Sequence, residues 1–190
     1  MDLIAALDEV GTEFGRLVAG TAPEQLGATT PCTEFSVRDV INHVAGGANM
    51  FGAAFEAGSI SDEELGWIMS GDILGDDPSG VYEAASERVM TAIRAPGAMD
   101  GTATFPWGEM PRDAALGIAV FDVAVHAWDL AQATGQTIEL SDDVALEILA
   151  LGHAMGLDAF RGEMFAEEVI IIETAPAWDR VAAYSGRAVG

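Results

Sequence analysis

The segment from Ala114 to Ala131 constrains the fold of this chain more than any other part of the sequence. It reads AALGIAVFDVAVHAWDLA, and it is apolar on nearly every face of a helix. A helix of this kind is usually covered by protein on all sides, so we expect it to be the most buried helix of the fold. The helix is predicted to extend from about Pro111 to Thr134, where Gly135 provides the stop.

Three ionisable side chains interrupt this apolar helix. An offset of four residues places Asp122 and His126 on one face, one turn apart, and Asp129 lies a further turn along the same stripe. A carboxylate in an apolar helix costs several kcal/mol unless it is paired or bound to a metal. The pattern alone leaves two alternatives open: a buried Asp–His hydrogen bond within the core, or two ligands of a metal ion inside a helical bundle.

A metal ion would need a third ligand, and the chain has two further histidines. His43 borders the apolar stripe of a second helix and can face inward, whereas His153, near the end of a later helix, fits a peripheral role. One inward histidine together with Asp122 and His126 would make an open three-ligand site. Two imidazoles and a carboxylate suit zinc, nickel or ferrous iron, and they leave positions for water or substrate.

Helices are predicted to dominate the rest of the chain. The second helix begins at Ser36, which stands three residues before Asp39 in a weaker form of the capping box. Residues 102–111 are expected to be extended or turn-like, and residues 167–174, EEVIIIET, to form a short strand or a buried loop. Apolar spacing predicts further helices over residues 2–18, 62–69, 78–93 and 141–155, and a short one within 175–187. Residues 1–190 are therefore predicted to form a single all-α domain, an up-and-down four-helix bundle with additional short helices.

The charge balance excludes several classes of function. The chain has 31 acidic and 8 basic residues and a formal net charge of −23, and all its basic residues are arginines. Such a chain repels both a phosphate backbone and an anionic membrane surface, so neither nucleic acid nor a membrane is an expected partner.

The N-terminus lacks the basic region of a secretory signal, and no long apolar stretch is free of charges, so we expect a cytoplasmic location. A single cysteine, Cys32, allows no internal disulfide.

Two blocks and the tail of the sequence carry a family resemblance. The blocks are TPCTEFSVRDVINHVAGGANMFGAAFEAG and FPWGEMPRDAALGIAVFDVAVHAWDLAQATG, and the tail is PAWDRVAAYSGR. Together they resemble the DinB-like metalloproteins, above all the metal-binding domain of mycothiol-dependent maleylpyruvate isomerase and its actinobacterial relatives. The resemblance implies a DinB-like four-helix bundle that holds one divalent metal ion, zinc in the first place, through His43, Asp122 and His126.

The same resemblance implies a function. The thiol of those relatives is mycothiol, so we expect a thiol-dependent transferase or isomerase acting on a small electrophile, with pairing of two chains into a homodimer. The isomerase has a glutamate where this chain has Asp122, and it carries a C-terminal domain that contributes to its active site, whereas this sequence stops at Gly190. The specific maleylpyruvate reaction is therefore not expected. The rival interpretations are a non-catalytic protein that binds metal or a small molecule, and a buried polar network without metal.

Two further side chains lie close to the candidate ligands in the sequence. Cys32 precedes the second helix by four residues and could lie near the open side of a metal, although packing within a loop is the commoner role. Asp129 could hold a ligand histidine by its free N–H, or it could pair with Arg38 or with another residue. The sequence by itself identifies no catalytic and no cofactor-binding residue.

Four more residues flank or belong to the apolar helix and its approach. Trp107 and Trp128 are candidates for a pocket wall, with core packing as the commoner role of tryptophan. Glu109 and Arg112, near the start of the helix, are expected at the surface.

Overall fold

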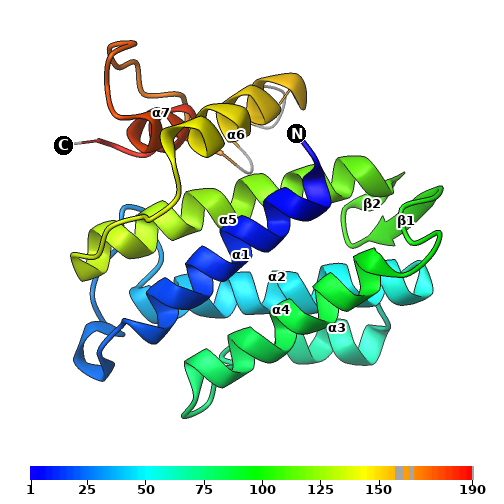
Figure 1. Cartoon of the computed structure of the whole chain (residues 1–190). Coiled ribbons are helices and arrows are strands. Elements are labelled where there is room, and N and C mark those ends of the chain that lie inside the picture. The colour runs from blue at the N-terminus through cyan, green and yellow to red at the C-terminus, as the bar shows by residue number, and fades with distance from the viewer. Residues whose placement is uncertain (157–160, 163–164, 190) are drawn as a thin grey trace.

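Four long helices form a bundle, and shorter helices and one hairpin surround it (Figure 1). The structure is a computed structural model that describes residues 1–156, 161–162 and 165–189. The bundle consists of α1 (Leu3–Ala19), α2 (Val37–Ala57), α4 (Pro78–Arg94) and α5 (Arg112–Thr134). The shorter elements are the 3₁₀ helix η1 (Pro23–Gln25), α3 (Asp62–Ile68), α6 (Asp142–Ala154), α7 (Ala177–Tyr184) and the strands β1 (Thr102–Phe105) and β2 (Gly108–Pro111). The predicted all-α four-helix bundle with additional short helices is confirmed.

The helices α1 and α2 stand at opposite corners of the bundle, and each packs against both α4 and α5. In Figure 1, α1 and α5 run in one direction and α2 and α4 run in the other. The successive helices α2 and α4 are therefore parallel, because residues 58–77, which include α3, carry the chain back along the bundle. One long crossover thus replaces a simple hairpin connection between antiparallel neighbours, so the predicted up-and-down order is wrong at this step.

Local sequence signals set the ends of the helices. Ser36 Oγ accepts a hydrogen bond from the backbone N–H of Asp39, and the Asp39 carboxylate accepts one from the Ser36 N–H, which closes the predicted capping box. The helix α5 ends where Gly135 adopts a φ of 71°, a left-handed conformation that glycine tolerates well. The helices begin and end within about two residues of the predicted boundaries.

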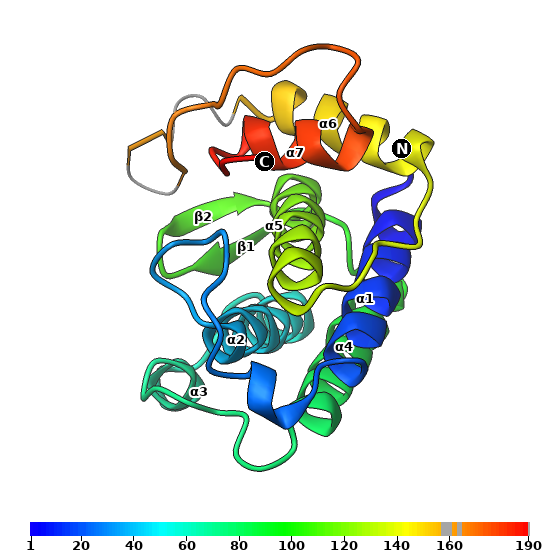
Figure 2. The ribbon, with the colours of Figure 1, turned by 90° about the vertical axis from the view of Figure 1, so that its left-hand side faces the viewer.

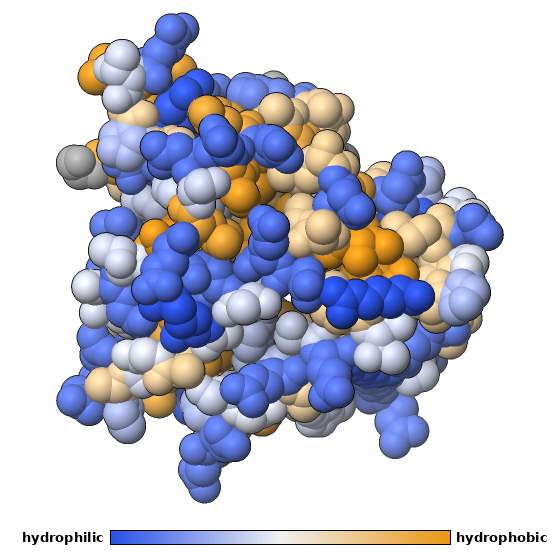
Figure 3. All heavy atoms as spheres, in the orientation of Figure 1, coloured by the Kyte–Doolittle hydropathy of each residue, from blue (hydrophilic) through white to orange (hydrophobic). Residues whose placement is uncertain are grey.

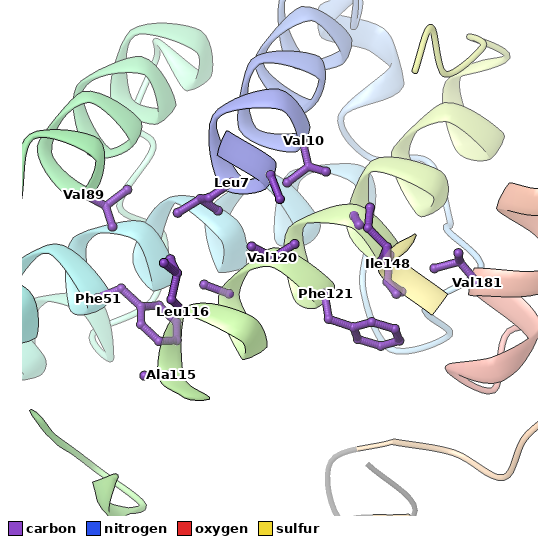
Figure 4. Close-up of a cluster of buried hydrophobic side chains, with 14 of the residues drawn as sticks. Leu7, Val10, Phe51, Val89, Ala115, Leu116, Val120, Phe121, Ile148 and Val181 are labelled. Atoms are coloured by element: carbon purple, nitrogen blue, oxygen red, sulfur yellow. The ribbon is translucent and has the colours of Figure 1, made fainter. Parts of the chain in front are cut away.

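The helix α5 is covered on both sides, which explains its nearly uniform apolar sequence. Leu116 and Val120 face the interior of the bundle, while Phe121 points toward Ile148 of α6 and Val181 of α7 (Figure 4). Figure 2 shows α6 and α7 lying across the outer face of α5. By length and composition α5 could cross a membrane, but 83% of its most apolar window is buried inside the protein. Its apolar character is that of a core helix.

The connection between α4 and α5 is a β-hairpin. Strand β1 pairs with β2 in antiparallel register, with Thr102 opposite Pro111 and Phe105 opposite Gly108. Pro106 therefore lies in the turn. The sequence predicted only extended or turn-like backbone here, because strands of four residues are too short to show a clear alternation of apolar and polar side chains.

The prediction for residues 167–174 was wrong. This segment is neither a strand nor a buried loop: Ile170 is 84% exposed and Ile172 is 72% exposed. A run of β-branched residues forms a strand only where a partner strand is within reach. Here the segment makes one backbone hydrogen bond to the end of α7, from the N–H of Val169 to the carbonyl of Ala183.

Charged side chains cover the outside of the bundle. Figure 3 shows mainly hydrophilic side chains over α1 and α4, with smaller apolar patches between them. Four of the five arginines on the bundle helices pair with carboxylates, and this pairing commits their positive charges to the fold. The pairs are Arg16 with Glu13 and Glu139, Arg38 with Asp72, Arg88 with Glu56 and Glu64, and Arg94 with Asp8.

Candidate metal centre

Three side chains meet where α2 packs against α5. His43 comes from α2, and Asp122 and His126 come from successive turns of α5. His43 Nε2 lies 3.4 Å from both carboxylate oxygens of Asp122, and His126 Nε2 lies 3.6 Å from Asp122 Oδ1. One donor atom from each residue falls within 4.8 Å of the other two. The fold therefore brings together the three residues that the spacing of the sequence suggested.

The spacing of these donor atoms fits a shared cation better than direct hydrogen bonds. A good N–H···O hydrogen bond is about 2.7–3.2 Å long, which is shorter than the separations at Asp122. Around a tetrahedral zinc ion with bonds of about 2.0–2.1 Å, neighbouring ligand atoms lie about 3.3 Å apart. The separations of 3.4 and 3.6 Å are close to that value. The set of two imidazole nitrogens and one carboxylate also suits a divalent ion.

A buried ion pair holds His126 in place. His126 Nδ1 lies 3.0 Å from Asp129 Oδ2, and Asp129 is fully buried. Arg187, which follows α7, donates two hydrogen bonds to the same carboxylate, of 3.2 and 2.8 Å. An ionised carboxylate can only accept, so Nδ1 of His126 donates its hydrogen to Asp129, and Nε2 is the ring nitrogen that faces Asp122. Asp129 therefore holds a histidine by its N–H, as the first alternative predicted, and it also pairs with another residue, Arg187, as the second allowed. The pairing with Arg38 is wrong, because Arg38 pairs with Asp72.

The charges at the site shift the pKa values of its members in opposite directions. Burial works against the ionised form of Asp122, but the neighbouring His43 and His126 outweigh it and hold the pKa of Asp122 well below its usual range. The negative charge of Asp122 raises the pKa of His43 against the effect of burial. Burial also disfavours the ionised form of Asp129, yet the hydrogen bonds from His126 and Arg187 lower the pKa of Asp129. Both carboxylates are therefore ionised at neutral pH.

A groove opens beside His43 along one face of α2. Gly47 and Met50 follow His43 by four and seven residues, so the three lie on the same face of the helix. All three line a groove of about 650 Å³, together with Phe35 and Trp107. Trp107 therefore forms part of a pocket wall, one of the two roles predicted for it. The side chain of His43 is 43% exposed beside this groove, whereas that of His126 is 6% exposed.

With this geometry established, comparison with known proteins gives the family. Residues 7–131 match the model of the mycothiol maleylpyruvate isomerase N-terminal domain, a range that contains His43, Asp122 and His126. The chain belongs to this family. It is also 35% identical over 195 residues to an uncharacterised protein of Mycobacterium tuberculosis, found in strains CDC 1551 and H37Rv, and the match covers the whole of both chains.

Solved structures agree with the family assignment at the level of the fold. The crystal structure of mycothiol-dependent maleylpyruvate isomerase matches with a TM-score of 0.58, and that of a histidine-to-alanine mutant of the same enzyme with 0.60. Each match covers 78% of this chain and 67% of the other, with 18% sequence identity. At this identity the likeness establishes that the chain has the DinB-like bundle fold of its family, and the predicted resemblance is confirmed.

Cys32 lies close to the site, at the edge of a second group of donor atoms. Its Sγ is within 4.8 Å of donor atoms of His126 and Asp129. Asp129 already accepts hydrogen bonds from His126 and Arg187, so a cation placed in this second group would be repelled by the guanidinium. The group that contains His43 and Asp122 is therefore the better candidate for a cation.

The remaining predicted residues lie away from the three donor side chains. His153 is on α6, where its ring lies 4.2 Å from that of Tyr184. Trp128 is buried in the core and donates its indole N–H to Asp179. Glu109 is exposed, as predicted.

The surface prediction for Arg112 was wrong. Arg112 is half-buried, and its guanidinium donates hydrogen bonds to the carbonyls of Phe55, Ala98 and Thr102. Arg112 therefore links the end of α2, the segment that follows α4 and the hairpin that precedes α5.

Arg187 is the residue of the site that sequence reasoning missed. It lies 58 positions after Asp129, and no local pattern links the two. One signal was present: a carboxylate in the most apolar helix needs a cationic partner, and the chain has only eight basic residues from which to choose.

Proposed function

We propose that this member of the mycothiol maleylpyruvate isomerase N-terminal domain family binds one divalent metal ion through His43, Asp122 and His126. The bound ion serves a thiol-dependent transfer or isomerisation of a small electrophile. Zinc is the first candidate for the ion, and nickel and ferrous iron are the others. The thiol is of the mycothiol type, the cofactor named for the solved enzyme with this fold. The protein acts in the cytoplasm, without a nucleic-acid or membrane partner.

One observation carries the proposal: donor atoms from His43, Asp122 and His126 meet within 4.8 Å of one another. The Nε2 of His126 has its lone pair free for a ligand role because Asp129 fixes the hydrogen on Nδ1. Three protein ligands leave at least one position of a tetrahedral ion open, which is the arrangement of catalytic rather than structural zinc sites.

Each residue has a separate part in the proposed chemistry. Asp122 supplies the negative charge that favours a cation between the two imidazoles, and it stays ionised because its pKa is low. His43 is the ligand beside the groove, so the open position can be reached from there. A divalent ion held in this way lowers the pKa of a coordinated thiol or water toward neutrality.

The experiment that tests the proposal is elemental analysis of protein purified without added metal. We expect about one divalent ion per chain in the wild type, and loss of that ion in His43→Ala, Asp122→Asn and His126→Ala. His153→Ala is the matched control, since it removes a histidine that lies against Tyr184 instead. Metal content that follows His153 and ignores His43 would overturn the ligand assignment.

A second assay separates catalysis from simple binding. The metal-loaded protein is incubated with mycothiol and a panel of small electrophiles, and loss of free thiol is followed. Turnover that disappears in His43→Ala supports the transferase or isomerase assignment. Full metal occupancy with no turnover would assign the chain to the non-catalytic, metal-binding alternative. Light scattering on the same samples tests the expected homodimer.

A further inference from the structure

The groove beside His43 has an apolar lining built from four parts of the chain. The side chains come from the segment before α2, from α2 itself, from α3 with its C-terminal residue, and from the turn of the hairpin. They are Phe35, Met50, Leu65, Ile68, Met69 and Trp107. Met69 is 75% exposed and Trp107 is 46% exposed, and with the other four side chains they form a contiguous apolar lining that is open to solvent.

The polar side chains of the groove are already engaged or carry the wrong charge for an anion. Asn42 donates its amide to the carbonyl of Gly71 and accepts from the N–H of Ile73. Asp39 is tied into the capping box of α2, and Glu34 is exposed. Both are carboxylates, so an anionic ligand would be repelled.

No arginine is among the groove residues, the one histidine, His43, already faces the carboxylate of Asp122, and the arginines around the groove are committed to other partners. Arg38 holds Asp72 and the carbonyl of Gly75, and Arg187 holds the buried Asp129. Within the described part of the chain, the groove therefore offers no guanidinium to pair with a carboxylate. Burying an unpaired carboxylate against this lining would cost several kcal/mol, whereas an uncharged aryl or alkyl group would gain from burial.

We propose that this groove binds the uncharged, apolar body of a small molecule and rejects carboxylates. Its identification as the site for the electrophile rests on the proposed function. If both hold, the substrate class of this chain is a neutral aryl or alkyl electrophile rather than a dicarboxylate. The apolar body would lie along α2, with its reactive end toward His43.

Two glycines allow the groove to be blocked with a matched control. A side chain at Gly47 would project into open space on the groove face of α2, because no atom lies within 4 Å of an added Cβ. Gly47→Leu therefore fills the groove, and it also removes a glycine from a helix interior, which favours folding. Gly66→Leu is the control: it makes the same change in α3, with equal space around the Cβ, at a residue that does not line the groove.

The experiment measures binding of three isosteric probes by ¹⁹F NMR to the full chain in excess chelator. The probes are 4-fluorobenzyl alcohol, 4-fluorobenzoate and 4-fluorobenzylammonium, which differ in charge. Chelation prevents a metal ion from holding the carboxylate. We expect the neutral alcohol to bind at least about tenfold more tightly than either ion, and Gly47→Leu to weaken its binding by at least about tenfold. Gly66→Leu should bind it like the wild type.

Three results would overturn the inference. The first is equal binding of the alcohol and the benzoate, the second is tighter binding of the ammonium probe, and the third is unchanged alcohol binding in Gly47→Leu. Circular dichroism and thermal midpoints of both glycine variants establish that they are folded. Because the measurement needs neither metal nor thiol, its outcome is independent of the metal analysis and turnover assays that test the proposed function.

Discussion

The two histidines of the candidate metal centre have contrasting surroundings. On the α5 side, His126 is 6% exposed, and its Nδ1 is held by Asp129, which is in turn held by Arg187. On the α2 side, His43 is 43% exposed. Its ring lies against those of Phe35 and His126, and among the described residues Asp122 is the side chain within hydrogen-bond distance of it. One half of the site is thus fixed by a buried network, and the other half borders a groove.

The two halves of the site therefore differ in kind: the α5 half is held rigidly, and the α2 half is accessible. A ligand whose orientation is fixed before binding loses little freedom when an ion arrives, so in the proposed metal site the α5 half would set the geometry. The half that borders the groove can admit water, a thiol or a substrate without unfolding part of the core. Four predictions test this contrast between the two halves of the site.

The largest effect is expected from Arg187→Met, which removes the cation from the buried pair. Asp129 is fully buried and the Arg187 side chain is 12% exposed, so the variant strands a buried carboxylate. We expect the free energy of unfolding in chelator to fall by about 3–5 kcal/mol in urea titrations. Arg94→Met is the control, because the Arg94–Asp8 pair is about half exposed on both sides and is worth under about 1 kcal/mol. Equal losses in the two variants would show that the buried network does not stabilise the α5 half.

The second prediction concerns metal affinity. Asp129→Asn keeps the shape of the side chain but removes the charge that orients His126, so affinity for zinc should fall about 10–100-fold in a competition assay with a chelating dye. Asp179→Asn is the matched control. The Asp179 carboxylate of the wild type also accepts a hydrogen bond from an α5 side chain, the indole N–H of Trp128, but it does not contact a proposed ligand histidine through that bond. An unchanged affinity in Asp129→Asn would mean that His126 needs no such support.

The third prediction concerns pH, and it applies to the α2 half. Because Asp122 raises the pKa of His43, the protonated pair stabilises the chelated protein fully below about pH 6.5 and loses this contribution as pH rises through the raised pKa. The difference in thermal midpoint between wild type and His43→Gln should therefore be larger at pH 5.5 than at pH 8.5. The effect is small, since His43 is 43% exposed.

Saturating zinc should reverse this pH dependence. The metal needs neutral His43, so in zinc the advantage of the wild type over His43→Gln should grow as pH rises. Asp122 stays ionised throughout this range because its pKa is well below the usual value. A difference that follows pH in the same direction with and without zinc would contradict a ligand role for His43.

The smallest effect is expected at Cys32, which lies beside the fixed half. Burial raises the pKa of the Cys32 thiol, against the opposing charge of Arg187. Alkylation by iodoacetamide at pH 7.5 should therefore be slower than that of free N-acetylcysteine. Cys32→Ser should leave metal content unchanged and alter stability by less than about 0.5 kcal/mol. Loss of metal in this variant would make Cys32 a ligand.

The helices were predictable because their signals are local. The capping box at Ser36 and Asp39, and the glycine stop at position 135, act within a few residues of the helix ends that they define. The proximity of Asp122 and His126 on α5 was predictable for the same reason, since the two residues are one turn apart. The hairpin and the exposed segment 167–174 were harder, because strand formation depends on a partner elsewhere in the chain.

The contacts between distant segments could not be predicted from one sequence. Nothing near Arg38 in the sequence shows that Asp72 will be its partner, and nothing near Asp129 points to Arg187. The parallel course of α2 and α4 likewise depends on how residues 58–77 pack. Such contacts are decided by which of several carboxylates and arginines the folded bundle brings together.

The ion pair between Arg187 and Asp129 also determines when during synthesis the contacts of the site can be completed. When residues 1–134 have been synthesised, all three proposed metal ligands are present in the nascent chain. Arg187, which pairs with Asp129, lies 58 positions after Asp129 and is synthesised later. Until α7 and Arg187 emerge and dock, the Asp129 carboxylate that holds His126 Nδ1 lacks its cationic partner. The proposed site therefore acquires its full set of contacts only at a late stage of folding, once the segment that follows α7 is in place.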